Sequence, residues 1–157
     1  MTRQTITLRV LLGMLLFALL LGAGLLYLAS LESARNWPEL AHLRLPTYVA
    51  VMAGLVPVIV AVKIVFDFLA VVDHGEAFST ETLKLLRRLR LLIGAFAGYF
   101  ALGLAGFWTL SGLMHPTLLF AWIVLEIATL FLFTVVALFE RIFGVALELR
   151  EDNELTV

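Results

Sequence analysis

Residues 10–31 read VLLGMLLFALLLGAGLLYLASL and contain no charged side chain. A hydrocarbon layer about 30 Å thick is crossed by roughly 20 helical residues, so this stretch is long enough to span a bilayer as a helix. It is also longer than the apolar core of a cleaved signal peptide, which is about 7–15 residues. We therefore predict a retained transmembrane helix near the N-terminus.

Three further apolar stretches follow the first. Residues 91–114 carry no charge, the stretch 47–72 is interrupted only by Lys63 and Asp67, and the stretch 117–139 only by Glu126. The chain is 62% hydrophobic and 15% charged, unlike an ordinary soluble domain. We predict an all-α integral membrane bundle of four transmembrane helices, forming one domain over residues 1–157. The expected spans are residues 8–31, 47–72, 90–114 and 117–141.

The basic residues predict how these helices are oriented. With the N-terminus inside, the outer side keeps only Arg35 and Arg44. The inner side then collects Arg3, Arg9, Lys84, Arg87, Arg88, Arg90, Arg141 and Arg150. Because Lys and Arg near span ends are enriched on the cytoplasmic side, both termini are predicted to be cytoplasmic. The cytoplasmic parts would be the loop 73–89 and the tail 142–157.

The helix ends have their own signals. The first helix is expected to end near Leu31, the second to begin at about Thr47, and residues 114–116 to form a tight turn. Residues 73–76 (Asp-His-Gly-Glu) should break the chain, and Ser79 then has the properties of a helix N-cap, with Phe78 and Leu83 placed for a hydrophobic staple. The third helix should run from there into the membrane. The fourth should continue past the membrane before the acidic residues 151–154 fray.

Small residues recur at four-residue spacing in the third span. They are Gly94, Gly98, Ala101 and Ala105. Small side chains let helix backbones approach closely in lipid, where burying apolar surface does not drive association. This stripe has two interpretations, which are packing within one chain or the face of a homodimer.

Lys63 and Asp67 lie near the inner end of the second span, about 24 Å and 30 Å below its outer end. They are four residues apart and can form an ion pair on one helix face. Lys63 can also extend its ammonium toward the interface. The pair is either a plain interfacial anchor or a functional site.

Glu126 lies roughly 13 Å below the outer end of the fourth span, close to the membrane midplane. An acidic group there costs on the order of 3 kcal/mol on insertion scales unless it is protonated or partnered. At the same depth Pro57 leaves the carbonyl of Ala53 without its usual donor. We predict that a neutral Glu126 donates a hydrogen bond to that carbonyl, either to fix the bundle or as a proton- or cation-responsive site.

The sequence favours no catalytic function. His42, His74 and His115 are scattered without metal-ligand spacing, and there is no cysteine. No glycine-rich phosphate motif is present, and no serine has a recognisable base beside it. We therefore expect no enzyme activity, no cofactor, no metal site and no direct binding of nucleic acid.

Two phrases outside the spans resemble a known family. The stretch 75–89, GEAFSTETLKLLRRL, is similar to the G-x-x-F-S…L-R pattern of the bacterial membrane family catalogued as domain of unknown function 2975. The ending 143–157, FGVALELREDNELTV, resembles that family's final acidic segment, which ends in D-L-T-V or D-L-T-I. This chain has Glu154 where an aspartate is usual, and Ala146 and Leu147 where the family often has a more polar helix end.

The resemblance implies a role for the cytoplasmic side. Members of the family often appear beside small helix-turn-helix regulators, which implies a protein of the bacterial cytoplasmic (inner) membrane that docks a cytoplasmic DNA-binding regulator. The docking residues implied in this chain are Phe78, Ser79, Leu83, Arg87, Arg88, Glu151, Asp152, Asn153, Leu155, Thr156 and Val157.

Other interpretations stay open. Basic residues at this level also attract anionic lipid headgroups, by about 1 kcal/mol each. A small transporter or channel subunit could use Glu126 as its coupling group, although four-helix multidrug exporters carry their glutamate in the first helix and this chain has no acidic residue there. A third interpretation is a structural helper of a larger membrane complex.

Overall fold

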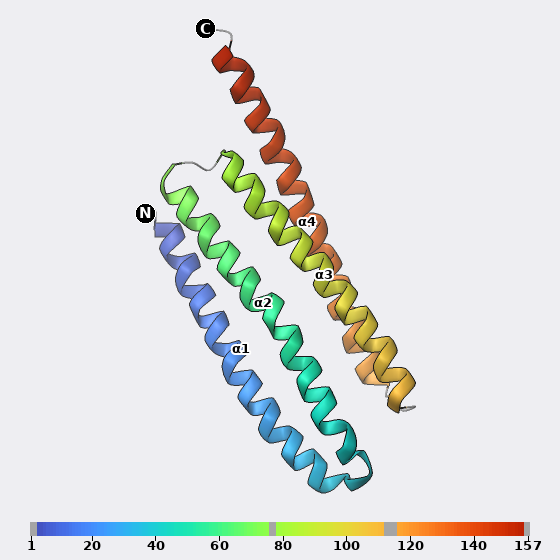
Figure 1. The fold of residues 1–157 in the computed structure, drawn as a ribbon. Coiled ribbons are helices and arrows are strands. Elements are labelled where there is room, and N and C mark those ends of the chain that lie inside the picture. The colour runs from blue at the N-terminus through green and yellow to red at the C-terminus, as the bar shows by residue number, and fades with distance from the viewer. Residues whose placement is uncertain (1–2, 76–77, 112–115, 156–157) are drawn as a thin grey trace. The chain divides into compact units, whose positions relative to one another are not determined.

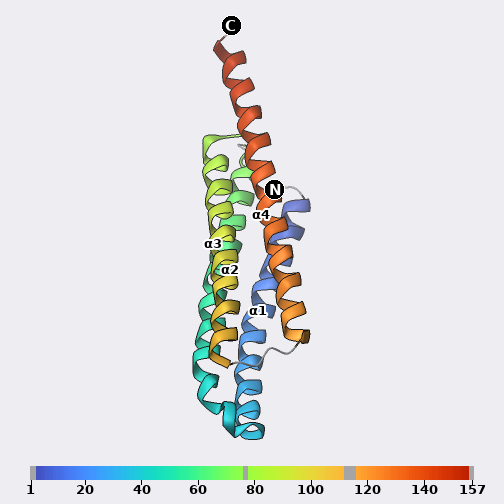
Figure 2. The same cartoon turned by 90° about the vertical axis from the view of Figure 1, so that its right-hand side faces the viewer.

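The computed structural model of the chain is all-α. It describes residues 3–75, 78–111 and 116–155, and no strand occurs in these ranges. Four α-helices and one 3-10 helix follow one another along the chain (Figures 1 and 2). They are α1 (Arg3–Asn36), η1 (Pro38–Leu43), α2 (Arg44–Asp73), α3 (Thr80–Ser111) and α4 (Pro116–Leu155).

Each of the four α-helices is long and apolar enough to cross a membrane. The candidate spans within the described residues are Thr5–Asn36, Ala41–Asp73, Thr80–Thr109 and Leu119–Arg150. Large apolar side chains are exposed along them, for example Phe17 at 68%, Leu102 at 75% and Phe120 at 69%. Such surface is costly in water and is suited to contact with lipid tails.

The first two helices are longer than the sequence predicts. α1 does not end near Leu31 but continues to Asn36, because Glu, Ala and Arg are good helix formers. It ends where Trp37 precedes Pro38, a position at which the proline ring disfavours helical backbone; Trp37 has φ −130° and ψ 73°. α2 starts at Arg44 rather than Thr47, since a proline is tolerated in the first turn of a helix.

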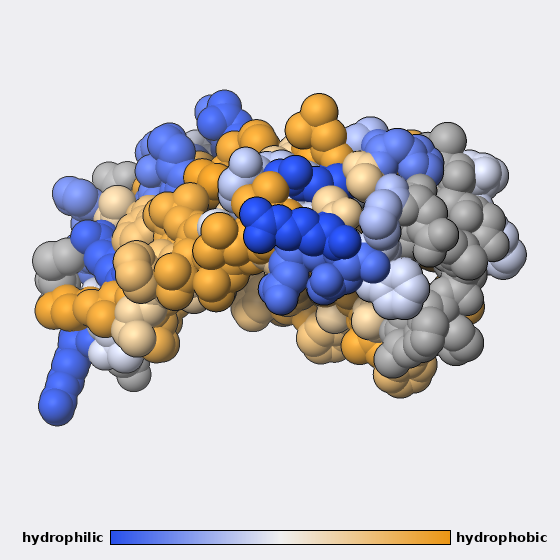
Figure 3. Space-filling view, turned by 90° about the horizontal axis from the view of Figure 1, so that it is seen from below, coloured by the Kyte–Doolittle hydropathy of each residue, from blue (hydrophilic) through white to orange (hydrophobic). Residues whose placement is uncertain are grey.

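The chain divides into two compact units, Met1–Val62 and Lys63–Val157. The first unit is a hairpin of α1 and α2 joined by η1 (Figure 1). Arg44 ties its two helices together: the guanidinium lies 5.4 Å from the Tyr27 ring centre, and Nε donates to Ser30 Oγ at 3.3 Å. Tyr27 and Tyr48 also meet edge-on at 5.4 Å. Seen from the η1 end, hydrophilic and hydrophobic side chains lie next to one another (Figure 3).

The second unit begins with the last turns of α2. This helix ends at Asp73, and Gly75 follows with φ +82°, a left-handed conformation that glycine adopts without strain. α3 begins at Thr80, and the backbone N–H of Thr82 donates to Ser79 Oγ at 3.2 Å. The predicted N-cap at Ser79 is therefore confirmed.

α3 and α4 pack side by side in antiparallel directions (Figures 1 and 2). Trp122 of α4 lies across α3, with its ring centre 4.6 Å from that of Phe100 and its Nε1 donating to the Phe100 carbonyl at 3.2 Å. Further along, Phe133 of α4 lies over Gly94, and a Cβ at Gly94 would be 3.1 Å from Phe133 Cε2. Large aromatic rings on α4 therefore fill the space left by small residues on α3.

Only part of the predicted small-residue stripe takes part in this packing. Gly94 meets α4, and Ala97 between the predicted positions is buried. Gly98, Ala101 and Ala105 are exposed, and among the described residues no atom would lie within 4 Å of a Cβ at Gly98. The homodimer interpretation of the exposed part stays a prediction.

The predicted fraying of the acidic tail is wrong. α4 is helical through Leu155 and includes residues 151–154. An existing helix is extended at little cost, because each added residue forms one more backbone hydrogen bond without a new nucleation step. The predicted turn at 114–116 falls mainly outside the described residues; Pro116 is the first residue of α4.

Candidate functional site

The second unit brings the two family-like phrases together at one end of α3 and α4. Phe78, just before α3, stacks on Phe143 of α4 with ring centres 5.1 Å apart and an interplanar angle of 28°. Phe68 of α2 meets the same Phe143 ring at 6.4 Å in an edge-on arrangement. Three segments that are distant in the sequence therefore share one aromatic cluster, Phe68–Phe78–Phe143.

The N-cap of α3 lies beside this cluster. Ser79 Oγ is also 3.3 Å from the hydroxyl of Thr82, and Thr82 is fully buried. The buried Leu85 and Leu86 follow on the next turn. The N-cap and the burial of Leu85 and Leu86 therefore stabilise the start of α3, the stretch that also carries the exposed basic residues.

An ion pair links the two helices next to the charge-free stretch of α3 and the apolar stretch 117–139 of α4. Arg90 Nε lies 3.2 Å from Glu140 Oε2, and both side chains are mostly covered, with 32% and 21% of their surface exposed. The contact has the distance of an ion pair without the angle of a hydrogen bond. Partial burial reduces the screening by water and salt, so this pair contributes more than a fully exposed one.

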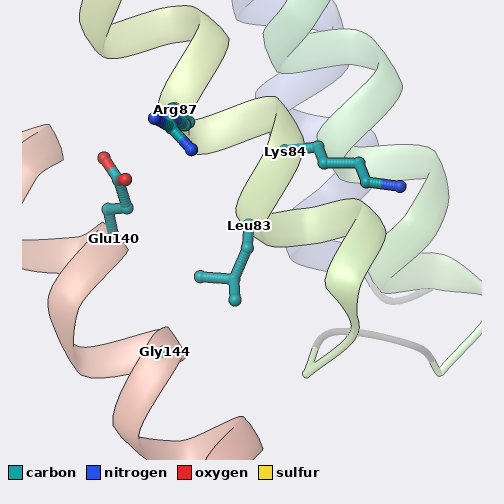
Figure 4. Close-up of a pocket in the computed structure, with 5 residues that line it drawn as sticks. All are labelled: Leu83, Lys84, Arg87, Glu140 and Gly144. Carbon is teal, nitrogen blue, oxygen red and sulfur yellow. The ribbon is translucent and has the colours of Figure 1, made fainter.

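A groove of about 280 Å³ opens beside this ion pair. It is lined by Leu83, Lys84, Arg87, Glu140 and Gly144 (Figure 4). Leu83 points from α3 toward α4, and its Cδ2 is 4.0 Å from the position that a Cβ of Gly144 would take. Because Gly144 has no side chain, the space between it and Leu83 stays part of the groove.

Of the predicted docking residues, the structure brings together Phe78, Ser79, Leu83 and Arg87 at this end. Arg88 is exposed on the same stretch of α3. Glu151, Asp152, Asn153 and Leu155 belong to the last turns of α4, and their side chains lie outside the described part of the chain, as do Thr156 and Val157.

Four residues of this site were not predicted from the sequence: Arg90, Glu140, Phe143 and Gly144. Phe143 and Gly144 open the second family-like phrase, so that phrase was the available signal. For Arg90 and Glu140 the signal was a pair of opposite charges at the ends of two adjacent apolar spans.

Lys63 and Asp67 form the predicted ion pair. Lys63 Nζ donates to Asp67 Oδ2 at 3.2 Å, and the side chains are 76% and 47% exposed. At this exposure, an i, i+4 pair stabilises a helix by a few tenths of a kcal/mol, about 0.3–0.5 kcal/mol. The geometry fits the interfacial-anchor interpretation.

Glu126 lies on the face of α4 that also carries Trp122 and Phe133, the two residues that contact α3. Its Oε2 is buried and has no hydrogen-bond partner among the described residues of its unit. Beside it, the buried Thr129 satisfies its own hydroxyl by donating to the Leu125 carbonyl at 2.8 Å. One of the two carboxyl oxygens of Glu126 is therefore covered by protein, and the predicted role of this residue stays a prediction.

Ala53 and Pro57 belong to the first unit, and α2 remains helical across Pro57. Glu126 belongs to the second unit. The predicted hydrogen bond from Glu126 to the Ala53 carbonyl joins the two units and stays a prediction.

The comparison with known proteins agrees with the two phrases at this site. The model of the family described as "Protein of unknown function (DUF2975)" matches residues 27–157. The chain belongs to this family. It is also 21% identical over 126 residues to the "Uncharacterized membrane protein YoaS" of Bacillus subtilis (strain 168), an alignment that covers 80% of this chain and 79% of YoaS. No solved structure matches the chain.

The family resemblance predicted from the sequence is therefore confirmed. With four apolar helices and a membrane protein as its relative, the chain is a multi-pass membrane protein.

Proposed function

We propose that this protein is a docking platform in the bacterial cytoplasmic membrane, with both termini in the cytoplasm. Its partner is a small helix-turn-helix regulator, which binds at the end of the second unit that carries the Phe68–Phe78–Phe143 cluster. The role is binding rather than catalysis. The excess of basic residues at this end supports its placement in the cytoplasm.

One observation carries the proposal. The two phrases that resemble the family, residues 75–89 and 143–157, start next to each other in space although they are far apart in the sequence. Phe78 of the first stacks on Phe143 of the second, and Leu83 of the first faces Gly144 of the second. Two segments that share one surface can be recognised together by one partner.

The surface at this end has the properties of a protein-binding site. Phe78 stays 47% exposed while its ring is held by Phe143, so an aromatic side chain is presented in a fixed position. Arg87 and Arg88 are exposed nearby on α3. Aromatic and arginine side chains contribute most of the binding energy in many interfaces.

Co-purification tests this proposal. The full-length protein, solubilised in mild detergent, should capture a small DNA-binding protein, and a chain ending at Leu149 should lose it. Phe78→Ala should weaken capture by at least tenfold, as expected for an anchor residue that contributes about 2 kcal/mol. Trp37→Ala removes an aromatic residue of the first unit that is 58% exposed, and this variant should capture as the native protein does.

The proposal fails if all four proteins capture the same amount, or if none captures a DNA-binding protein. Far-UV circular dichroism and gel filtration of each variant separate a lost interface from a lost fold.

A second candidate function is supported by Glu126. A buried carboxyl oxygen without a hydrogen-bond partner among the described residues is suited to binding a proton or a cation during transport. In proteoliposomes, a transporter or channel subunit should show pH-dependent flux that Glu126→Gln abolishes. Glu81→Gln changes an exposed carboxylate outside the apolar span and is the control. Native rates in Glu126→Gln would exclude this function.

A further inference from the structure

The groove between α3 and α4 is lined by two cations and one anion. Glu140 is already paired with Arg90, so its charge is matched by a residue outside the lining. Arg87 faces Glu140 across the gap, and Lys84 borders the groove with its side chain extended away from α4 (Figure 4). Within the described part of the chain, neither Arg87 nor Lys84 has an ion pair. Arg87 therefore leaves one unmatched positive charge in the groove, and Lys84 adds a second at its border.

The depth of the groove places it in the headgroup layer of the membrane. The charge-free stretch of α3 begins at Leu91, and Arg87 and Lys84 lie about 6 Å and 10 Å before it along the helix. On α4, Gly144 lies about 8 Å beyond Phe139, the last residue of the apolar stretch before Glu140. The headgroup layer on each side of the hydrocarbon is roughly 5–8 Å thick, so the lining residues and the phosphates occupy the same level.

The surface below the cations is apolar. Leu91 follows Arg87 by four residues and Lys84 by seven, so these three share one face of α3. Leu91 is 61% exposed, and Leu102 further along the same face is 75% exposed. A molecule with a phosphate at Arg87 and hydrocarbon chains along Leu91 and Leu102 would match both parts of this face. A free phosphate would contact only the basic part at Arg87 and would leave the apolar part unused.

From this geometry we propose that the groove is a binding site for an anionic phospholipid. The phosphodiester accepts hydrogen bonds from the Arg87 guanidinium, and Lys84 adds a second positive charge. The Arg90–Glu140 pair keeps the Glu140 carboxylate from repelling the lipid. Gly144 leaves room for the headgroup between the helices. The groove shares Leu83 and Arg87 with the proposed docking surface, but lipid binding can be measured on this chain alone, without a protein partner.

Native mass spectrometry of the purified protein tests the site without any partner. Detergent micelles containing phosphatidylglycerol should give a protein–lipid complex, and phosphatidylcholine at the same concentration should bind more weakly because its choline carries a positive charge. Arg87→Gln should lower the affinity for phosphatidylglycerol by at least tenfold, since it removes charge-assisted hydrogen bonds.

Arg88→Gln is the matched control. Arg88 is exposed and adjacent in sequence, but it does not line the groove. Arg88→Gln should remove only the diffuse attraction of one basic residue. The affinity for phosphatidylglycerol should therefore fall by at most about fivefold. Gly144→Leu fills the groove without changing any charge, and it should weaken binding as Arg87→Gln does. Equal effects of Arg87→Gln and Arg88→Gln would overturn the proposal, because they would indicate diffuse attraction alone.

Inorganic phosphate distinguishes a lipid site from a plain anion site. Millimolar phosphate should not displace phosphatidylglycerol, because it cannot use the apolar face at Leu91 and Leu102. Complete displacement by phosphate would refute the lipid assignment. If Gly144→Leu proves misfolded by circular dichroism, the comparison of Arg87→Gln with Arg88→Gln still decides the question.

Discussion

Gly94 and Gly98 are one turn apart on α3, yet among the described residues Gly94 meets a side chain of another helix and Gly98 does not. The difference arises on α4, where Phe133 lies against Gly94, while no described side chain comes within 4 Å of a Cβ at Gly98. In lipid, close contact between helices is a main source of stability, because burying apolar surface gains little. The two glycines therefore differ in their contribution to packing, although both belong to the same series of small residues at four-residue spacing.

Gly94→Leu should destabilise the protein by about 1–3 kcal/mol, the usual cost of overpacking a well-packed contact. Leucine has a better helix propensity than glycine by roughly 1 kcal/mol at either position, so Gly98→Leu controls for this gain. The free energy of unfolding in mixed detergent micelles measures both variants. Equal stabilities of the two variants would contradict the packing described for Gly94 and Phe133.

The residue scale is also where prediction from sequence is least complete. The stripe of small residues indicates close packing, and its spacing alone does not say which member faces the neighbouring helix. Gly94 and Ala97 take part, while Ala101 and Ala105 are exposed. That choice depends on the positions of Phe133 and Trp122 on α4, which are distant in the sequence.

At the scale of single elements, the start of α3 follows from local chemistry. The N-cap at Ser79 and the break at Gly75 are both recognisable from the sequence, because each depends on a few neighbouring residues. The C-terminal ends of α1 and α4 cannot be recognised from the sequence in this way, because a helix that is already formed extends easily through residues such as 32–36 and 151–155.

Ser79→Ala should lower the stability of the second unit by about 1–2 kcal/mol, in the upper part of the range for a lost N-cap. Thr82 is fully buried, so its N–H has no access to water once the Ser79 hydroxyl is removed. Hydrogen exchange of the first turn of α3 should accelerate accordingly. Ser79→Asp keeps an acceptor at the cap and should restore slow exchange; fast exchange in that variant would argue against capping as the cause.

At the scale of the whole molecule, four apolar helices are predictable because each span is a local property of composition and length. The contact between the two family-like phrases, residues 75–89 and 143–157, is not predictable in this way. It depends on long-range contacts such as Phe78–Phe143. The candidate site was therefore predicted as two separate phrases, and their shared surface emerged only from the fold.

The orientation of the chain is testable because it contains no cysteine. Single substitutions Ala41→Cys and Glu81→Cys place one thiol at exposed positions near opposite ends of the spans. In intact bacterial cells, a membrane-impermeant maleimide should label Ala41→Cys directly and Glu81→Cys only after permeabilisation, as the positive-inside distribution predicts. The reverse pattern would place both termini outside.

The unbroken course of α4 has a mechanical consequence. The helix continues for 16 residues from Phe139, the end of its apolar span, to Leu155, a distance of about 24 Å. A continuous helix of this kind acts as a lever: a tilt of ten degrees within the membrane displaces its far end by roughly 4 Å. Because helix tilt responds to bilayer thickness, changes in lipid composition would be converted into movement of the segment that is proposed to meet a regulator.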